Sequence, residues 1–450
     1  MKIFSADWVL PISAAPISGG AIAFAENKII AIGKSEEIKE DFPRAETEDF
    51  GEAVIMPGFV NAHSHLELTA MRGFLDELEN DFSAWLVMLA KIRAEKLTEA
   101  DIETAAVWGA LEGARAGVTC FADIGRYGRA GLRALKVNGL RGVVFQETEF
   151  SSKNEEAAED FARLKEKFLA LRAEETNLVE VGISPHAPYT VSKNLFQKIT
   201  DYAFSKDVKI SVHAAESKEE SEFMLRGAGF FSDIYEKFNL VWDAPGISSI
   251  EYLSEIGVLQ ARPLLAHCVK TNEKDFDLIG ESNSSIAHCP KSNAKFGHGV
   301  APYEKFLEKN LRVGLGSDSV ASNNVCDILE EARFAALFAR SREEKNDLIA
   351  AKKILETATL GGAQALGLEN EIGTLDAGKQ ADFIVVSLSS VAQHPVHDIF
   401  STLLFASTAR DVRLTIVAGE EIYREGMSKK VDEKELKIKI KEIAKKMSNN

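Results

Sequence analysis

The strongest constraint on the fold is an alternation of short apolar runs with longer helical segments over about residues 57–365. Strands that are apolar on both sides are typical of parallel sheets whose crossovers are helices. Eight strand–helix units fit an α/β fold of the (β/α)₈ TIM barrel type. The eight predicted strands are residues 57–65, 118–125, 141–147, 179–186, 208–216, 262–269, 284–290 and 312–318.

The two chain ends have a different pattern, in which short strands alternate with turns. We expect the two ends to pair as one small β-sandwich domain, with the barrel inserted between them. The predicted division is residues 1–56 and 366–425 for the two parts of the β-sandwich, 57–365 for the barrel, and 426–450 for a C-terminal helix with a Lys-rich face.

Composition excludes several classes of protein. The net charge of −16 argues against nucleic-acid binding, which requires a basic surface. No apolar run approaches the length of a membrane span, and the N-terminus lacks the apolar core of a signal peptide, so we expect no membrane partner. The four cysteines form no CxxC pair, which favours buried thiols in a reducing cytoplasm.

Ionisable residues gather where the predicted strands end, which is the active-site face of a (β/α)₈ barrel. A single histidine at such a position is most often a structural core residue, but a whole set of them indicates a site. The set consists of His63, His65, His186, His213, Glu216, His267, His288 and Asp318.

The spacing of these residues indicates a metal site. His63 and His65 are two positions apart on an extended strand, so both side chains point into the barrel. With His213 and Asp318 from strands 5 and 8, they predict a site for one divalent ion with a position open for water. Such an ion lowers the pKa of a bound water toward ~7. Zn²⁺ is the first expectation, and Fe²⁺ or Mn²⁺ suits the same donors.

Glu216 follows His213 by three residues, just beyond the strand end. A carboxylate there suits a proton shuttle that reaches a substrate without binding the metal. The alternative is a salt bridge within the loop.

Two connections are long for a barrel, residues 72–97 and 217–257. Long connections often serve as lids or binding loops. The alternative is an insertion that packs its own aromatic side chains.

Several motifs together resemble the amidohydrolase superfamily over about residues 1–425. They are MPGFVNAHSH at 56–65, GLGSD at 314–318 and GTLDAGKQADFIVV at 373–386. Within the superfamily, the chain is similar to the adenosine, S-adenosylhomocysteine and methylthioadenosine deaminases and their chlorohydrolase relatives. The supporting stretches are residues 71–77, 184–192, 213–217, 288–303 and 314–333.

The resemblance implies roles for individual residues. Glu216 passes a proton to the ring nitrogen beside the attacked carbon, His267 orients the attacking water, and Asp318 takes a proton from it. Strand 4 carries His186 instead of the bridging lysine of binuclear members, which favours one metal. The metal ligands implied are His63, His65, His213 and Asp318, and His186, Ser292 and Asn293 lie near the substrate. Relatives are commonly homodimers.

The chain also departs from its best-known relatives. After the HxH motif it reads HSHLELTAMRG, with Glu67 where methylthioadenosine deaminases have proline, and their ribose-binding glutamate has no certain counterpart near Ala94 or Glu95. These features resemble aminodeoxyfutalosine deaminases of menaquinone synthesis. The benzoate of that nucleoside needs a cation. We therefore expect Glu67 near the substrate, together with Arg72, Arg126 or Arg129.

Two other functions are alternatives to an adenine-nucleoside deaminase. A triazine chlorohydrolase or another aromatic aminohydrolase needs the same metal residues and differs in the group released. A non-catalytic relative typically lacks metal ligands, whereas this chain has every ligand expected.

Overall fold

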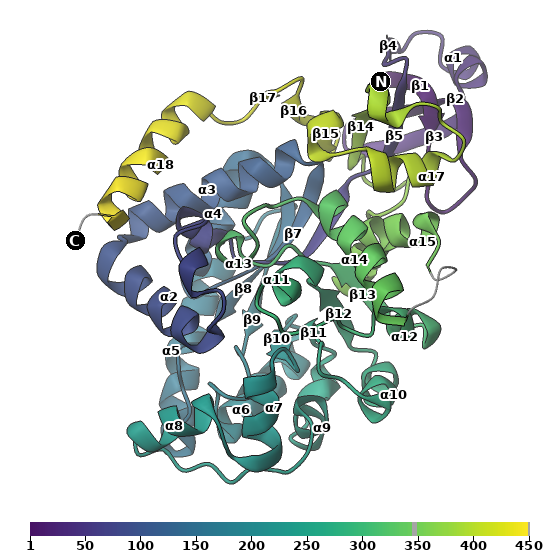
Figure 1. The fold of residues 1–450 in the computed structure, drawn as a ribbon. Coiled ribbons are helices and arrows are strands. Elements are labelled where there is room, and N and C mark those ends of the chain that lie inside the picture. Colours follow the sequence, from purple (N-terminus) through teal and green to yellow (C-terminus); the bar gives the residue numbers. More distant parts are fainter. Residues whose placement is uncertain (344–348, 449–450) are drawn as a thin grey trace.

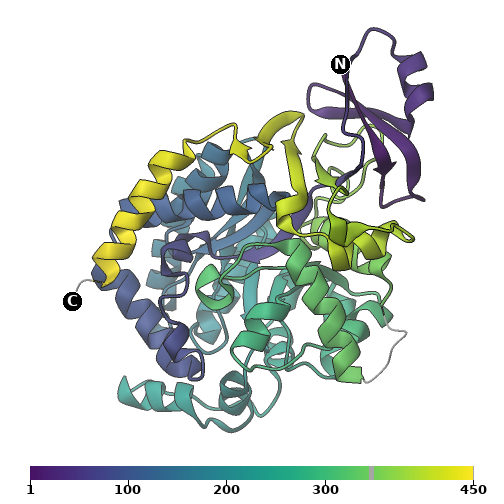
Figure 2. The same ribbon diagram turned by 45° about the horizontal axis from the view of Figure 1, so that its top comes forward.

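The computed structural model describes residues 1–343 and 349–448. It places a barrel beside a smaller β-domain that contains the N-terminus, and the C-terminal helix lies along the outside of the barrel (Figure 1). Seen from the second direction, strands from both ends of the sequence share the β-domain (Figure 2). The fold class predicted from the sequence is confirmed.

All eight barrel strands lie within the predicted ranges, in two four-stranded parallel sheets of order β6-β7-β8-β9 and β10-β11-β12-β13. Single parallel bridges, Ile183↔Ile210 and Ser64↔Asp318, connect the two sheets at both seams. The strands are β6 (Phe59–Ser64), β7 (Val118–Gly125), β8 (Arg141–Glu147), β9 (Val179–Ser184), β10 (Ser211–Ala214), β11 (Leu264–His267), β12 (Ser285–His288) and β13 (Arg312–Leu315).

Helices follow the strands and cover the outside of the barrel (Figure 1). One of them, α3, begins with a capping box, in which Thr98 and Asp101 satisfy each other's backbone N–H groups. The main helices are α2 (Phe82–Lys96), α3 (Glu99–Arg115), α4 (Gly128–Asn138), α5 (Ala157–Arg172), α6 (Lys193–Lys206), α7 (Lys218–Arg226), α8 (Phe230–Lys237), α9 (Ser249–Glu255), α10 (Glu273–Ser282), α11 (Pro290–Lys295), α12 (Tyr303–Glu308), α13 (Val320–Asn323), α14 (Ile328–Glu343), α15 (Ala351–Glu356) and α18 (Glu433–Ser448).

The β-domain is one nine-stranded sheet of order β17-β16-β15-β14-β5-β1-β2-β3, with β4 beside β1. Two strands, β1 and β5, separate Phe24 on β2 from Phe383 on β14, yet the two ring centroids are 5.2 Å apart. Since neighbouring strands are about 4.8 Å apart, the sheet must curl over its own apolar face. The strands are β1 (Lys2–Val9), β2 (Ile17–Ala25), β3 (Lys28–Lys34), β4 (Glu46–Asp49), β5 (Ala53–Pro57), β14 (Phe383–Ser387), β15 (Val412–Val417), β16 (Glu420–Arg424) and β17 (Met427–Ser428).

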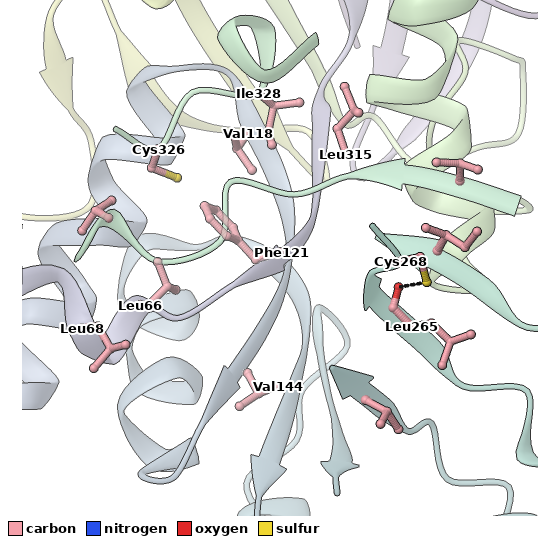
Figure 3. Close-up of a cluster of buried hydrophobic side chains, with 14 of the residues drawn as sticks. Leu66, Leu68, Val118, Phe121, Val144, Leu265, Cys268, Leu315, Cys326 and Ile328 are labelled. Carbon is pink, nitrogen blue, oxygen red and sulfur yellow. Dashed lines mark hydrogen bonds between the residues drawn. The ribbon is translucent and has the colours of Figure 1, made fainter. Parts of the chain in front are cut away.

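The core between strands and helices is closely packed. Figure 3 shows part of it, with Phe121 of β7 near Leu66 and Cys326. Gly113 of α3 makes room for this ring, because a Cβ there would lie 2.3 Å from Phe121 Cζ. The four cysteines are free and buried, as expected, and burial raises the pKa of Cys120 to about 12.

Among the described residues, no helix is both long and apolar enough to cross a membrane.

Candidate active site

Four side chains converge at the carboxyl ends of the barrel strands. His65 Nε2 lies 3.2 Å from His213 Nε2 and 3.5 Å from Asp318 Oδ1. His63 Nε2 lies 3.4 Å from the same oxygen of Asp318. β6, β10 and the turn after β13 therefore bring together the residues that the sequence predicts as metal ligands.

Backbone carbonyls orient two of these histidines. His65 Nδ1 is 2.9 Å from Ile124 O, and His213 Nδ1 is 3.2 Å from His186 O. Each Nδ1 therefore carries the proton and donates it to a carbonyl oxygen. The Nε2 lone pairs of the two rings therefore face each other. Metal-binding histidines are commonly held in this way, with the other ring nitrogen donating to a carbonyl oxygen.

The protonation states suit a cation. Burial lowers the pKa of His63 to about 4 and the pKa of His213 well below its usual value, so both rings are neutral. Burial alone would raise the pKa of Asp318, but the neighbouring His63, His267 and His65 hold it well below its usual value. Neutral imidazoles with one carboxylate form a donor set for a divalent ion.

The missing hydrogen bonds of one buried histidine indicate whether such an ion fits. His63 is fully buried, yet neither of its ring nitrogens has a hydrogen-bond partner among the described residues. A buried polar atom without a partner is costly. A cation bound between His63 Nε2 and its neighbours would remove that cost, so the residues present fit a metal.

Several non-glycine residues at this face have left-handed backbones. The φ angles are 54° at Ala215, 74° at His267, 49° at Cys268 and 55° at Asp318. Such conformations are unfavourable for residues with a Cβ, and they cluster where a side chain must be aimed at a site.

A second group lies beside the first. Glu216 Oε1 is 3.6 Å from His267 Nε2 and 3.7 Å from His298 Nε2. Burial, with the charge of Asp318 as the next contribution, raises the pKa of Glu216 well above its usual value. The carboxyl group can therefore be protonated at neutral pH and donate a proton.

Ser292 and Asn293, on α11, support the site residues. The Ser292 hydroxyl donates to Asp318 Oδ2 over 2.5 Å, and Ser322 donates to the same oxygen over 2.9 Å. His267 Nδ1 donates to Asn293 Oδ1 over 3.0 Å. Neither Ser292 nor Asn293 lines the cavity described next, so the structure does not bring these two predicted substrate contacts to it.

A cavity of about 380 Å³ opens above these groups. Its floor includes His65, His186, His213, Glu216, His267 and Asp318. Its walls are mainly apolar and come from the two long connections, with Phe82, Trp85 and Leu89 on α2 and Phe230, Phe231 and Ile234 on α8. Both connections therefore contribute walls to the cavity.

Two expected substrate contacts lie elsewhere. Arg72 points away from the cavity, because it forms an ion pair with Glu112 of α3. Glu67 is buried outside the cavity, where it pairs with Arg93 at 2.7 Å and accepts a hydrogen bond from the Tyr127 N–H. Both expectations are corrected by the short helix Leu66–Met71, which turns these side chains away from the pocket.

Of the remaining arginine and histidine candidates, one lines the cavity and the others lie outside it. Arg126 lines the cavity, whereas Arg129 is 72% exposed and lies outside it. His288 is also outside, because its ring stacks on Tyr303 with centroids 5.1 Å apart.

Sequence reasoning missed Arg93, Glu147 and His298. Arg93 and Glu147 line the cavity, and His298 contacts Glu216. Glu147 ends β8, the third of the eight predicted strands, so its place at a strand end was the signal available for it.

The comparisons agree with this geometry. The profile of the amidohydrolase family matches residues 54–422. A 5-methylthioadenosine/S-adenosylhomocysteine deaminase of Moorella thermoacetica is 32% identical over 436 residues, covering 95% of each chain. An adenosine deaminase from Xanthomonas campestris, solved with bound zinc, superposes with a TM-score of 0.88 at 26% identity, covering 99% of this chain and 98% of that one.

The aminofutalosine deaminase of Helicobacter pylori, solved with methylthio-coformycin, has the same fold. Its TM-score is 0.77 at 23% identity, covering 94% of this chain and 100% of that one. The profile match and the relative above 30% identity extend over most of the sequence. The chain therefore belongs to the amidohydrolase family and is a hydrolase of carbon–nitrogen bonds.

Proposed function

We propose that this protein hydrolytically deaminates an adenine-type nucleoside, converting the 6-amino group to a 6-oxo group with release of ammonia. The observation that carries the proposal is the buried carboxyl of Glu216, which has a raised pKa and lies in the cavity beside the histidine cluster. Deaminase relatives at 32% identity support the same reaction class.

We infer one divalent ion at the floor of the cavity, with zinc as the first candidate because the Xanthomonas campestris relative binds it. Fe²⁺ and Mn²⁺ suit the same donors. When bound, the ion supplies an acidified water at neutral pH. The proposed ligands are His63, His65, His213 and Asp318.

The protein's own groups move the protons. Asp318, ionised because its pKa is low, accepts a proton from the attacking water at its carboxylate. Glu216, protonated because its pKa is high, donates a proton to the ring nitrogen beside C6. The proton taken up by Asp318 then passes to the amino group, which leaves as ammonia, and the proton of the added hydroxyl group returns to Glu216. His267, held by Asn293, contacts the oxygen that is added to C6.

The finer proposal is that the nucleoside is aminodeoxyfutalosine. The apolar walls on α2 and α8 suit its aromatic substituent, and Arg126, which lines the cavity, offers a cation for its benzoate. The names of the curated relatives favour methylthioadenosine or S-adenosylhomocysteine instead, and these are the second candidate.

A substrate screen tests both levels of the proposal. The metal-loaded protein is given adenosine, methylthioadenosine, S-adenosylhomocysteine and aminodeoxyfutalosine, and ammonia and the loss of adenine absorbance are recorded. The proposal expects ammonia from at least one of them, with aminodeoxyfutalosine having the highest kcat/KM. Release of chloride from a chlorinated triazine, with no ammonia from any nucleoside, would instead assign the chain to the chlorohydrolase reaction.

A further inference from the structure

The cavity holds one acidic side chain that the proposed reaction does not use. Glu147 ends β8 and lines the cavity, and its side chain is 6% exposed. Its Oε2 is 3.5 Å from Arg126 Nε. Its Oε1 has no hydrogen-bond partner among the described residues.

An unpaired buried carboxylate oxygen requires a partner of a definite kind. An ionised carboxylate only accepts hydrogen bonds, so the partner must be a donor group or a cation. Leaving such an oxygen unsatisfied in a buried place is costly. Because Glu147 faces the cavity, a ligand can supply that partner.

A second metal ion is the alternative, since one carboxylate oxygen of Glu147 and one ring nitrogen each of His186 and His213 lie within 4.8 Å of one another. Two observations oppose it. His213 Nδ1 already donates to a backbone carbonyl, so its only free nitrogen is the one that faces His65 in the first cluster. The guanidinium of Arg126 also places a positive charge beside Glu147, which repels a second cation.

The partner is therefore a donor group of the organic ligand. In an adenine nucleoside, the ring nitrogens N1, N3 and N7 are acceptors, and the donors are the 6-amino group and the hydroxyl groups of the sugar. The 6-amino group is the one that leaves, and the proposed reaction already places it with Glu216 and Asp318. The same 4.8 Å grouping places Glu147 next to the floor of the cavity. The sugar, attached directly to the purine, carries the donors that remain for Glu147.

We propose that Glu147 is a specificity-determining residue that accepts a hydrogen bond from a sugar hydroxyl of the nucleoside, and that Arg126 positions it. This inference rests on the proposed function. It also gives a reason for the ion pair at the cavity wall: the Arg126 guanidinium lies 3.5 Å from one oxygen of the carboxylate, and the other oxygen is left for the ligand.

The test compares adenosine with 2′-deoxyadenosine and 3′-deoxyadenosine in the wild-type protein and in Glu147→Gln and Glu147→Ala. We expect the wild type to lose about 10-fold or more in kcat/KM when the relevant hydroxyl is missing, because a hydrogen bond to a buried charge is lost. In Glu147→Ala this penalty should shrink to about 2-fold or less, and Glu147→Gln should lie between the two.

Glu149→Gln is the matched control, since Glu149 is two residues away, 66% exposed and paired with Lys167. It should keep the wild-type penalty. Metal content and the thermal midpoint show whether each variant is folded. If Glu147→Ala does not fold, Glu147→Gln still tests the inference, because glutamine keeps the shape of the side chain.

Two results overturn the inference while leaving the proposed function intact. One is a wild-type protein that deaminates all three nucleosides equally. The other is a pair of Glu147 variants that slow all three by the same factor, as a purely structural residue would. Failure of the wild-type protein to deaminate any adenine nucleoside is a separate outcome, which removes the proposed function and this inference with it.

Discussion

Glu216 Oε1 lies 3.6 Å from His267 Nε2, although the two residues follow different barrel strands. Both are buried, and burial is the main cause of opposite shifts: it raises the pKa of the carboxyl and lowers the pKa of the imidazole. The pair therefore favours a neutral acid beside a neutral ring. That is the arrangement needed for one group to donate a proton while the other contacts the oxygen added to the substrate.

Replacing Glu216 by glutamine should abolish most of the activity while the protein keeps its metal. The amide cannot donate and recover a proton, and general acid catalysis contributes about 10²–10⁴-fold. Steady-state ammonia release and metal analysis of the same sample measure the two effects. Glu222→Gln, in the exposed ion pair with Lys218, is the control and should be active. Normal turnover by Glu216→Gln would show that another group moves the proton.

Asn293 should matter through His267. Asn293→Ala removes the acceptor of the ring N–H, so we expect kcat to fall about 10-fold with a smaller change in KM. Asn293→Asp keeps an acceptor oxygen in the same place and should recover most of the rate. It should also shift the kcat–pH profile, because a negative charge beside the ring favours the imidazolium. Equal losses in both variants, with an unchanged profile, would argue for a general packing role.

The buried Glu67–Arg93 pair, of which the sequence analysis named only Glu67 and as a substrate contact, should act on stability. Glu67→Leu leaves the guanidinium buried without its partner, at a cost of about 3–5 kcal/mol in the free energy of unfolding. The double variant Glu67→Leu/Arg93→Met should be markedly more stable than the single one. Urea unfolding of the two variants and the wild type measures this. A double variant no more stable than Glu67→Leu would contradict the account.

Glu331 should make stability depend on pH. It is buried against Asn323 and Lys291, and burial raises its pKa from 4.5 to about 8. Between pH 4.5 and about 8, Glu331 therefore keeps a proton in the folded protein that it has lost in the unfolded chain. This contribution to the free energy of unfolding is fully present below pH 4.5 and is lost as the pH rises through 8.

Urea unfolding of the wild type and Glu331→Gln at several pH values tests the point. Glutamine has no proton to lose, so the variant's free energy of unfolding should fall less over this window than that of the wild type. Parallel curves for the two proteins would place the pKa of Glu331 near its unfolded value.

The strand positions could be predicted because the barrel strands are short apolar runs, most of which have a polar residue at or just beyond their ends. His63, His65, His213 and Asp318 converge for the same reason, since the strand ends of a closed barrel meet at one face. The paired chain ends were likewise visible as strand patterns separated by the barrel. These features depend on the local sequence pattern and on the fact that the strands of a closed barrel end at one common face.

The cavity walls could not be predicted in the same way. Glu67 and Arg72 are close to the HxH motif in sequence, but the helix that follows β6 directs them to Arg93 and Glu112. Arg93 reaches the cavity from α2 through packing that no local pattern encodes. Proximity in the sequence to a catalytic motif was therefore a poor guide to contact with the ligand.

The most direct test of the central claim is a titration of Zn²⁺ into metal-depleted protein while ammonia release from the best nucleoside is measured. The account predicts no activity without the ion and a linear rise that stops at one equivalent per chain. Full activity in the depleted protein, a rise that continues to two equivalents, or no ammonia at any ratio would contradict a deaminase with one metal ion at the mouth of its barrel.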